Sequence, residues 1–480
     1  MKQKVIAGLF WKVLENGGAQ GIQFVVAVIL ARLLTQAEYG TVGIIMIFIT
    51  IANVIVQNGF STALIQRRQA DATDFSSVCY FSLGAALVMY GILWALAPWI
   101  ADFYNIEELR PIVRVLALVL FPGAVISVQT AWVSRQLEFK GLFLSTFGAS
   151  VISGAVSIYM ALAGMGVWAM VGQQLAYYVS LTAILFVTVS WKPAFLFAFG
   201  RIRELLRFGW KLLAASLIDT LFNNLYGLIM GKIYSEEVLG VYNRGEQFPK
   251  LIVSNLGAAI QSVLLPVFSS RQGDKDSMKQ MLRRAVRLSS FLVLPMLFGM
   301  CAVADTLVLA LLGERWMGCV PYLRIMCVAY SFWPIHITNL QAINAAGRSD
   351  MFLKLEIVKK TMGLCGLFAG MRFGPLVLIS VKAGLDFLTT FVNAWPNKKL
   401  LGYGIFSQWA DILPSAGLSF VMCAAVYGAG LVLPGGPWIK LILQVAAGAG
   451  LYVCLAAAFR MESFLYMLGL IKSRKREREA

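Results

Sequence analysis

Long apolar segments follow one another along the whole chain, and short polar or glycine-containing segments separate them. The apolar segments are about 17 to 25 residues long, which is the length at which an α-helix crosses the hydrocarbon of a bilayer. Apolar and polar residues do not alternate with the period of a β-strand, so the pattern excludes a β-barrel. It predicts an all-α polytopic membrane protein with about 14 transmembrane helices.

The predicted spans divide into two sets of six and a final pair. In the first set they begin at Trp11, Tyr39, Val78, Val113, Phe143 and Val167. In the second set they begin at Phe208, Gln247, Leu288, Val320, Leu355 and Leu376, and the final pair begins at Leu413 and Trp438. The joins at residues 164–166 and 374–375 are so short that the span boundaries there are the least sharply marked.

One short pattern occurs twice, about 200 residues apart. The string ARLLT at residues 31–35, five positions before Gly40, corresponds to GKIYS at residues 231–235, five positions before Gly240. Each copy reads as an apolar helix with a cation at its end, a short polar turn with a glutamate, a glycine and a second apolar helix. A repeat of this length is too long for a solenoid unit. It predicts two parallel six-helix lobes around a central cavity, as in many secondary transporters.

These patterns predict five parts of the chain. They are an N-lobe at 1–190, a basic amphipathic cytoplasmic linker at 191–207, a C-lobe at 208–396, an appendage of two helices at 397–460, and a basic cytoplasmic tail at 461–480. The linker and the basic segment around residues 269–287 resemble helices that lie on an anionic leaflet. Charges that only fix the topology would explain both segments equally well.

Composition and charge fit this architecture. Hydrophobic residues make up 59% of the chain and charged residues only 14%, which is far from the balance of a soluble protein. The net charge is +17. If the gaps between spans are assigned alternately to the two sides, most Lys and Arg fall on one side, which the positive-inside rule assigns to the cytoplasm. Both termini are therefore expected in the cytoplasm, and the charge gives no reason to expect a nucleic-acid partner.

The sequence lacks the motifs for metal binding, ATP hydrolysis and histidine-based catalysis. The seven cysteines are scattered without a CxxC pair and mostly fall inside predicted spans, so they read as apolar packing residues. There is no P-loop, and His336 is the single histidine. No gap is long enough for a soluble catalytic domain. We therefore expect a membrane transporter that is not an enzyme, with no cofactor and no metal, and with an H⁺ or Na⁺ gradient as the candidate driving force.

Polar side chains inside the predicted spans are the candidate cavity lining. Asn16, Gln20, Gln23 and Ala27 fall on one helix face, and Ser216, Thr220, Asn223 and Gly227 are their counterparts in the second lobe. Amides suit sugar hydroxyls because they both donate and accept hydrogen bonds. We select Gln20, Gln23, Asn53, Gln57 and Asn223 as candidate sugar-binding residues. A hydrogen-bonded seam between helices is the alternative.

Charged side chains inside or beside the spans are the candidates for phosphate binding and ion coupling. Lys382 and Asp386 lie one helical turn apart, either as a self-neutralising pair or as a cation for phosphate beside a coupling carboxylate. Asp219 is the second candidate for ion coupling. Arg32 and Lys232 lie at equivalent non-cytoplasmic helix ends, where they either pair with Glu38 and Glu236 or bind a polyanionic headgroup.

Four strings carry a resemblance to a known family. They are LARLLT followed by EYG at residues 30–40, NGFSTALIQRR at 58–68, RQLEFK at 135–140 and, more weakly, GVYNR at 240–244. Over about its first 140 residues the chain resembles bacterial polysaccharide (Wzx-type) flippases, in the polysaccharide-transport family of the multidrug/oligosaccharidyl-lipid/polysaccharide exporter superfamily. In its last part the likeness is one of hydropathy only. The mid-membrane cations expected for the family are sparse here, with Lys382 the clearest.

The resemblance implies two lobes facing each other across a cationic cavity, with two extra helices. It also implies a flippase in the bacterial cytoplasmic (inner) membrane that moves an undecaprenyl-pyrophosphate-linked oligosaccharide to the outer leaflet by alternating access, for lipopolysaccharide or exopolysaccharide biosynthesis. Its partners would be that lipid substrate, membrane lipids, and the polysaccharide polymerase and chain-length machinery. On this hypothesis Arg32, Lys232 and Lys382 bind pyrophosphate. The alternatives are an ion-coupled exporter of small amphiphilic or cationic compounds on the same fold and, less favoured because no large external loop is present, a membrane polymerase or ligase.

Overall fold

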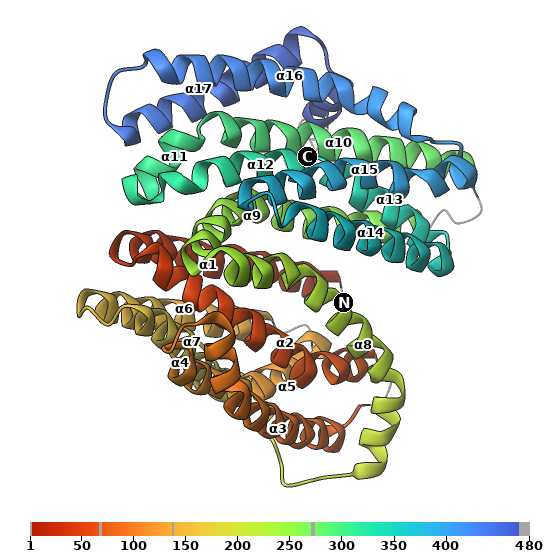
Figure 1. Ribbon diagram of the computed structural model, residues 1–480. Coiled ribbons are helices and arrows are strands. Elements are labelled where there is room, and N and C mark those ends of the chain that lie inside the picture. The colour runs from red at the N-terminus through yellow and green to blue at the C-terminus, as the bar shows by residue number, and fades with distance from the viewer. Residues whose placement is uncertain (1, 67–69, 137–138, 270–273, 470–480) are drawn as a thin grey trace. The chain divides into compact units, whose positions relative to one another are not determined.

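The computed structural model describes residues 2–66, 70–136, 139–269 and 274–469, and these residues form α-helices and short connections without a β-strand (Figure 1). The all-α fold class is therefore confirmed. The chain divides into two compact units, Met1–Gly240 and Val241–Ala480, and the boundary falls in the first turns of one long helix, α9.

In the residues that the structure describes, the first unit holds eight α-helices and the start of α9. Their bounds are α1 (Lys2–Leu33), α2 (Gln36–Gln66), α3 (Ala72–Tyr104), α4 (Leu109–Leu116), α5 (Leu120–Gln136), α6 (Phe139–Leu162), α7 (Val167–Thr188) and α8 (Phe199–Ile229), with a 3-10 turn η1 (Ala117–Val119) and a π-helical turn η2 (Met230–Tyr234). Helix α6 packs along α1 and α7, and α2 packs along α8. The core of this unit includes an aromatic cluster in which Phe75 meets Trp132 edge-on at 5.0 Å and Trp132 stacks on Trp191 at 6.2 Å.

The second unit contains the rest of the chain. Its helices are α9 (Glu236–Ser269), α10 (Lys275–Ala302), α11 (Ala304–Leu311), α12 (Val320–Ser331), α13 (Trp333–Ala345), α14 (Ser349–Gly370), α15 (Pro375–Leu401), α16 (Ile405–Val432) and α17 (Pro437–Ala458), with a 3-10 turn η3 (Glu314–Cys319). Within this unit α16 lies along α10, α17 lies along α16 and α11, and α15 lies against α12, α13 and α14 (Figure 1).

A charged cluster joins α16 to α10. Arg283 donates to the two carboxylate oxygens of Asp411 at 2.7 and 2.9 Å, and Arg287 donates to Asp411 at 2.9 and 2.5 Å. Tyr403 donates to the same carboxylate at 2.8 Å. Asp411 is only 8% exposed, so its charge depends on these donors. Helix α16, the first of the two helices predicted as an appendage, is thus held to α10 of the second unit.

Each of the fourteen predicted span starts lies in a helix, and two of them, Val167 and Val320, are the first residues of α7 and α12. Ten segments of the described residues are long and apolar enough to cross a membrane. The predicted spans in α1, α9, α12–α13 and α14 do not reach this criterion. Helix α14 carries Lys354, Glu356, Lys359 and Lys360, and α12 and α13 are separate helices on either side of Phe332. The protein is multi-pass, and the count of about 14 stays a prediction.

The very short joins are tight glycine turns. Gly164 and Gly166 between α6 and α7 have φ values of +75° and +53°, and Gly374 before α15 has φ +100°. Residues with a Cβ rarely adopt this backbone conformation, so glycine is what allows the chain to reverse here within a few residues.

The duplicated turns meet each other. A Cβ added at Gly40, in the first turns of α2, would overlap the backbone carbonyl of Glu236 at the start of α9. A Cβ added at Gly240 would overlap the carbonyl of Gln36 at the start of α2. The two copies of the repeat therefore place their glycines at one helix crossing, where backbone approaches backbone.

The predicted lobe, linker and appendage boundaries stay predictions. Contacts group α8 with the first unit through its packing on α2, whereas the sequence placed the second lobe from residue 208 onwards. The predicted linker forms an extended segment followed by the start of α8, where Arg201 donates to Asp71 at 2.6 Å. Part of the predicted tail, residues 470–480, lies outside the described residues.

Candidate functional site

Between residues 241 and 250, α9 carries three charged side chains, Arg244, Glu246 and Lys250, and Glu246 directly follows Gly245. A Cβ added at Gly245 would lie 2.8 Å from Cβ of Tyr322 and 2.9 Å from the carbonyl oxygen of Cys319. This close approach seats α9 on the start of α12. It also brings the next residue, Glu246, to the face of α12.

Glu246, Lys382 and Tyr330 form a polar contact between three helices of the second unit. Tyr330 on α12 donates its hydroxyl hydrogen to Oε1 of Glu246 at 2.9 Å. Lys382 on α15 donates to the same oxygen at 3.5 Å, and its Nζ lies 5.7 Å from the centre of the Tyr330 ring. The Lys382 and Glu246 side chains are 21% and 16% exposed, so the ion pair is largely removed from the surroundings.

Asp386, predicted for ion coupling, belongs to the same charged region of α15. It interacts electrostatically with Lys382, Glu246 and Lys359. The sequence suggested Asp386 as the partner that neutralises Lys382, and the structure shows Glu246 on another helix as an ion-pair partner. Next to this region Nδ1 of His336 lies 2.8 Å from Nδ2 of Asn393, as expected for a hydrogen-bonded histidine inside a bundle.

Two of the predicted sugar-binding amides bind each other. Gln57 donates to Oδ1 of Asn53 at 2.8 Å within α2. A Cβ added at Gly123 of α5 would lie 2.7 Å from Nε2 of Gln57, and the Tyr178 side chain of α7 hydrogen-bonds Asn53. These contacts have the geometry of a hydrogen-bonded seam between packed helices, which is the alternative to sugar binding in the sequence analysis.

The other unit 1 candidates are more accessible. Asn223 donates to Oδ2 of Asp219 at 2.9 Å on the exposed side of α8, so a candidate sugar ligand and a candidate coupling carboxylate bind each other. Gln20 and Gln23 are exposed on α1. The side chain of Asn16, which belongs to the same predicted stripe, lies outside the described residues.

The two predicted cations at helix ends differ in their contacts. Lys232, in η2, is exposed, donates to the backbone carbonyl of Phe103 and lies with Nζ 4.4 Å from the centre of the Phe103 ring. Arg32 is exposed in the last turn of α1. Glu38, its proposed partner, accepts hydrogen bonds from the backbone N–H of Thr35 at 2.6 Å and from the Thr35 hydroxyl at 2.9 Å.

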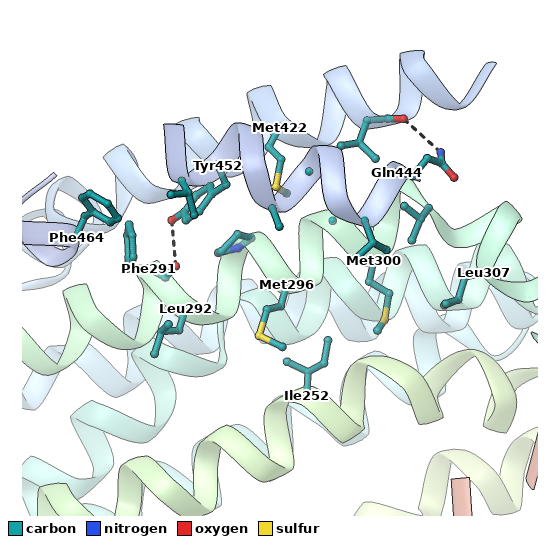
Figure 2. Close-up of a pocket in the computed structure, with 18 of the residues that line it drawn as sticks. Ile252, Phe291, Leu292, Met296, Met300, Leu307, Met422, Gln444, Tyr452 and Phe464 are labelled. Carbon is teal, nitrogen blue, oxygen red and sulfur yellow. Dashed lines mark hydrogen bonds between the residues drawn. The ribbon is translucent and has the colours of Figure 1, made fainter. Parts of the chain in front are cut away.

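An apolar pocket of about 580 Å³ lies within the second unit, between α10 and α17, with α9 and α16 at its margins (Figure 2). Its walls include Phe291, Leu292, Met296, Met300, Met422 and Phe464. The two polar side chains that Figure 2 shows beside it are turned to backbone carbonyls, Tyr452 to Phe291 at 3.0 Å and Gln444 to Val426 at 3.4 Å. Since a cavity of about 150 Å³ lined by such residues takes one benzene, this pocket can take a longer piece of hydrocarbon.

Sequence reasoning missed Glu246 and Tyr330. Glu246 lies one residue before the predicted span at Gln247, where a carboxylate reads as an ordinary helix-end charge. The spacing of Glu246 and Lys250, one turn apart on a helix, was the available signal. Tyr330 carried no signal, because only the packing of α12 on α9 makes it a partner.

These features define a polytopic α-helical membrane protein whose second unit holds the Glu246–Lys382 ion pair between α9 and α15. The family model described as "Polysaccharide biosynthesis protein" matches residues 29–321, more than half of the chain, and the protein belongs to this family.

The chain is similar over nearly its full length to curated proteins of bacterial polysaccharide synthesis. It is 24% identical to the teichuronic acid biosynthesis protein TuaB of Bacillus subtilis, over 94% of this chain and 95% of that protein. It is 21% identical to the succinoglycan biosynthesis transport protein ExoT of Rhizobium meliloti, over 97% and 95%. It is 23% identical to the lipopolysaccharide biosynthesis protein WzxC of Escherichia coli, over 91% and 89%. The resemblance to Wzx-type proteins is therefore confirmed.

A solved structure shares the fold. The lipid II flippase MurJ in an inward closed conformation superposes with a TM-score of 0.75 at 12% identity, over 94% of this chain and 98% of that chain. At this identity the likeness shows the fold alone.

Proposed function

We propose that this protein is a flippase, not an enzyme, that moves an undecaprenyl-pyrophosphate-linked oligosaccharide from the cytoplasmic to the outer leaflet by alternating access. The observation that carries the proposal is the family match over residues 29–321 together with full-length similarity to proteins of cell-surface polysaccharide synthesis, one of them a transport protein by name. The product would be used for lipopolysaccharide or exopolysaccharide synthesis.

The three chemical parts of such a substrate have candidate partners in this chain. Pyrophosphate is polyanionic and suits the cations Arg32, Lys232 and Lys382. Sugar hydroxyls suit the amides Gln20, Gln23, Asn53, Gln57 and Asn223, of which the exposed ones, Gln20, Gln23 and Asn223, are the more readily reached. The polyprenyl chain needs an apolar environment, which lipid and the pocket of Figure 2 both offer.

The proposal includes coupling to an H⁺ or Na⁺ gradient. Asp219 and Asp386 are the candidate coupling carboxylates, because an ionisable group inside a span is costly and marks ion pathways in transporters. The setting would be the bacterial inner membrane with both termini in the cytoplasm, as the charge distribution along the sequence favours. The polysaccharide polymerase and chain-length machinery would receive the flipped lipid.

Reconstitution into proteoliposomes tests the proposal. A fluorescent undecaprenyl-pyrophosphate oligosaccharide is placed in one leaflet, and its appearance in the other is followed with and without a pH or Na⁺ gradient. Transfer that depends on the protein supports a flippase, and stimulation by one gradient identifies the coupling ion. If the lipid does not move and a small organic cation is expelled instead, the fold carries a different cargo and the proposal is wrong.

A further inference from the structure

The Glu246–Lys382 ion pair occupies the cation that the proposed function needs for phosphate. Lys382 is the clearest cation within the spans, and its shown partner is a carboxylate at 3.5 Å. A carboxylate and a phosphate offer a lysine the same thing, a charged oxygen acceptor. A lysine held by one of them is less available to the other.

Glu246 also has a second cation within reach. Lys250 lies one turn further along α9, is exposed, and interacts electrostatically with Glu246. A glutamate followed by a lysine at this spacing is the favourable orientation for a pair on one helix. The carboxylate can therefore leave Lys382 without losing every cation, while Tyr330 on α12 stays as a hydrogen-bond donor.

We infer that Glu246 is an internal stand-in for the substrate phosphate. It holds Lys382 while the site is empty, and it exchanges to Lys250 when a phosphate of the lipid takes Lys382. The inference rests on the proposed function and deepens it by naming Glu246 as a specificity-determining residue and Lys250 as its second partner. In physical terms, Lys382 pairs with the Glu246 carboxylate when no lipid is bound and with the phosphate when lipid is bound. The lysine therefore keeps a charged acceptor in the empty site.

The exchange also sets a condition for release. After the lipid leaves, Glu246 returns to Lys382, so the lysine has an acceptor at each stage. Without the carboxylate, phosphate would bind more tightly and leave more slowly. A lysine alone would favour binding at the expense of turnover.

The decisive experiment measures binding of undecaprenyl pyrophosphate to the full-length protein in nanodiscs, with undecaprenol as the uncharged comparison. Glu246→Gln should tighten binding of the pyrophosphate lipid by about tenfold, since one charge-assisted competitor is removed, and should leave undecaprenol binding unchanged. Glu246→Asp keeps the charge but shortens the side chain. It should tighten binding by about two- to threefold, and it serves if the glutamine variant does not fold.

Two further variants test whether Glu246 exchanges between Lys382 and Lys250, or whether the lysines simply attract the phosphate. Lys382→Gln should weaken binding of the pyrophosphate lipid and remove the gain from Glu246→Gln in the double variant. Lys250→Gln should weaken binding in the wild type but not in the Glu246→Gln background, because Lys250 acts through Glu246. Asp305→Asn is the matched control, since it breaks another ion pair of the second unit, Arg324 with Asp305, and should leave the affinity unchanged.

The outcomes are distinct. If the wild type binds undecaprenyl pyrophosphate no better than undecaprenol, the proposed substrate is wrong. If the wild type discriminates between them but Glu246→Gln and Glu246→Asp bind no more tightly, the proposed function stands and the stand-in role of Glu246 is overturned. An equal effect of Lys250→Gln in both backgrounds overturns the exchange, because Lys250 would then attract phosphate directly.

Discussion

Helix α2 in the first copy of the repeat corresponds to helix α9 in the second copy. The two helices differ in the charge of the residues that follow the shared glycine. Both start after the duplicated turn, and their glycines, Gly40 and Gly240, meet at one crossing. Beyond that crossing α2 continues with Ile44, Met46 and Thr50, whereas α9 has Arg244, Glu246 and Lys250 at the same offsets. Both copies keep the glycine that sets the backbone geometry, but at these three offsets beyond the crossing only the second copy has charged side chains.

This difference shows which residues of the repeat serve helix packing and which are candidates for a role in transport. A glycine at a backbone crossing is required in both copies by sterics. A partly buried ion pair is seldom required for stability, since apolar residues of similar volume do as well or better. A charged group present in one copy and absent from the other is therefore the better candidate for a role in transport.

The largest expected effect follows from removing the lysine. Lys382→Ala should abolish lipid export, because the clearest span cation is lost, and should lower the thermal stability, because Glu246 loses its ion-pair partner. Adding Glu246→Gln should restore the stability and not the export. The checks are surface polysaccharide in cells and the unfolding temperature of the purified protein. Export by the double variant at the wild-type level would mean that Lys382 is structural.

The glycine crossing should behave alike in the two copies. Gly40→Ala and Gly240→Ala should each destabilise the protein by about 1–3 kcal/mol, since the added methyl group meets backbone that cannot move aside easily. Gly21→Ala on α1, where a Cβ meets nothing within 4 Å, is the control and should not destabilise. Unfolding in detergent provides the measurement. A clear difference between Gly40→Ala and Gly240→Ala would show that the two copies do not share the crossing equally.

Ion coupling gives a sharper comparison between the units. If the charged residues around Lys382 carry the coupling, Asp386→Asn should remove the stimulation of transport by a gradient. Asp219→Asn should change it by less than about twofold, since Asp219 already has Asn223 as an exposed hydrogen-bond partner. Transport rates with and without the gradient decide this. A larger loss of gradient stimulation in Asp219→Asn than in Asp386→Asn would place the coupling in the first unit.

The smallest effect concerns the pH dependence of the α3 cap. The hydrogen bond from Arg201 lowers the pKa of Asp71 below its ordinary value of 3.8. A lowered pKa in the folded state contributes stability above the unfolded pKa, and this contribution is lost as the pH falls through the folded value. Asp71→Asn should therefore be slightly less stable than the wild type at pH 7, and the difference should shrink as the pH falls below 3.8 and through the lowered pKa of Asp71. A difference that persists at low pH would mean that the cap does not depend on this charge.

The helices could be predicted from the sequence because span length and glycine position are local properties. Val167 and Val320 were placed at helix starts, and Gly164, Gly166 and Gly374 do form the tight turns. The duplicated string identified Gly40 and Gly240 as equivalent, although their direct contact is a tertiary feature that no local pattern reveals.

The candidate site was less predictable. Lys382 was selected because a cation inside a span is conspicuous in sequence. Its ion-pair partner, Glu246, lies on a helix more than a hundred residues earlier, and only the packing of α9 against α12 and α15 brings the two together. The Asn53–Gln57 hydrogen bond shows the opposite case, where amides chosen as ligands bind each other across one turn of α2.

The most direct test is the initial rate at which a fluorescent undecaprenyl-pyrophosphate oligosaccharide changes leaflet in proteoliposomes. The wild type is compared with the Lys382→Ala/Glu246→Gln double variant, in which no charge of the pair is left unpaired. The wild type should move the lipid, and the folded double variant should move it at the rate of protein-free vesicles. Equal rates for the wild type and the folded double variant would contradict the central claim that the Glu246–Lys382 pair handles the phosphate.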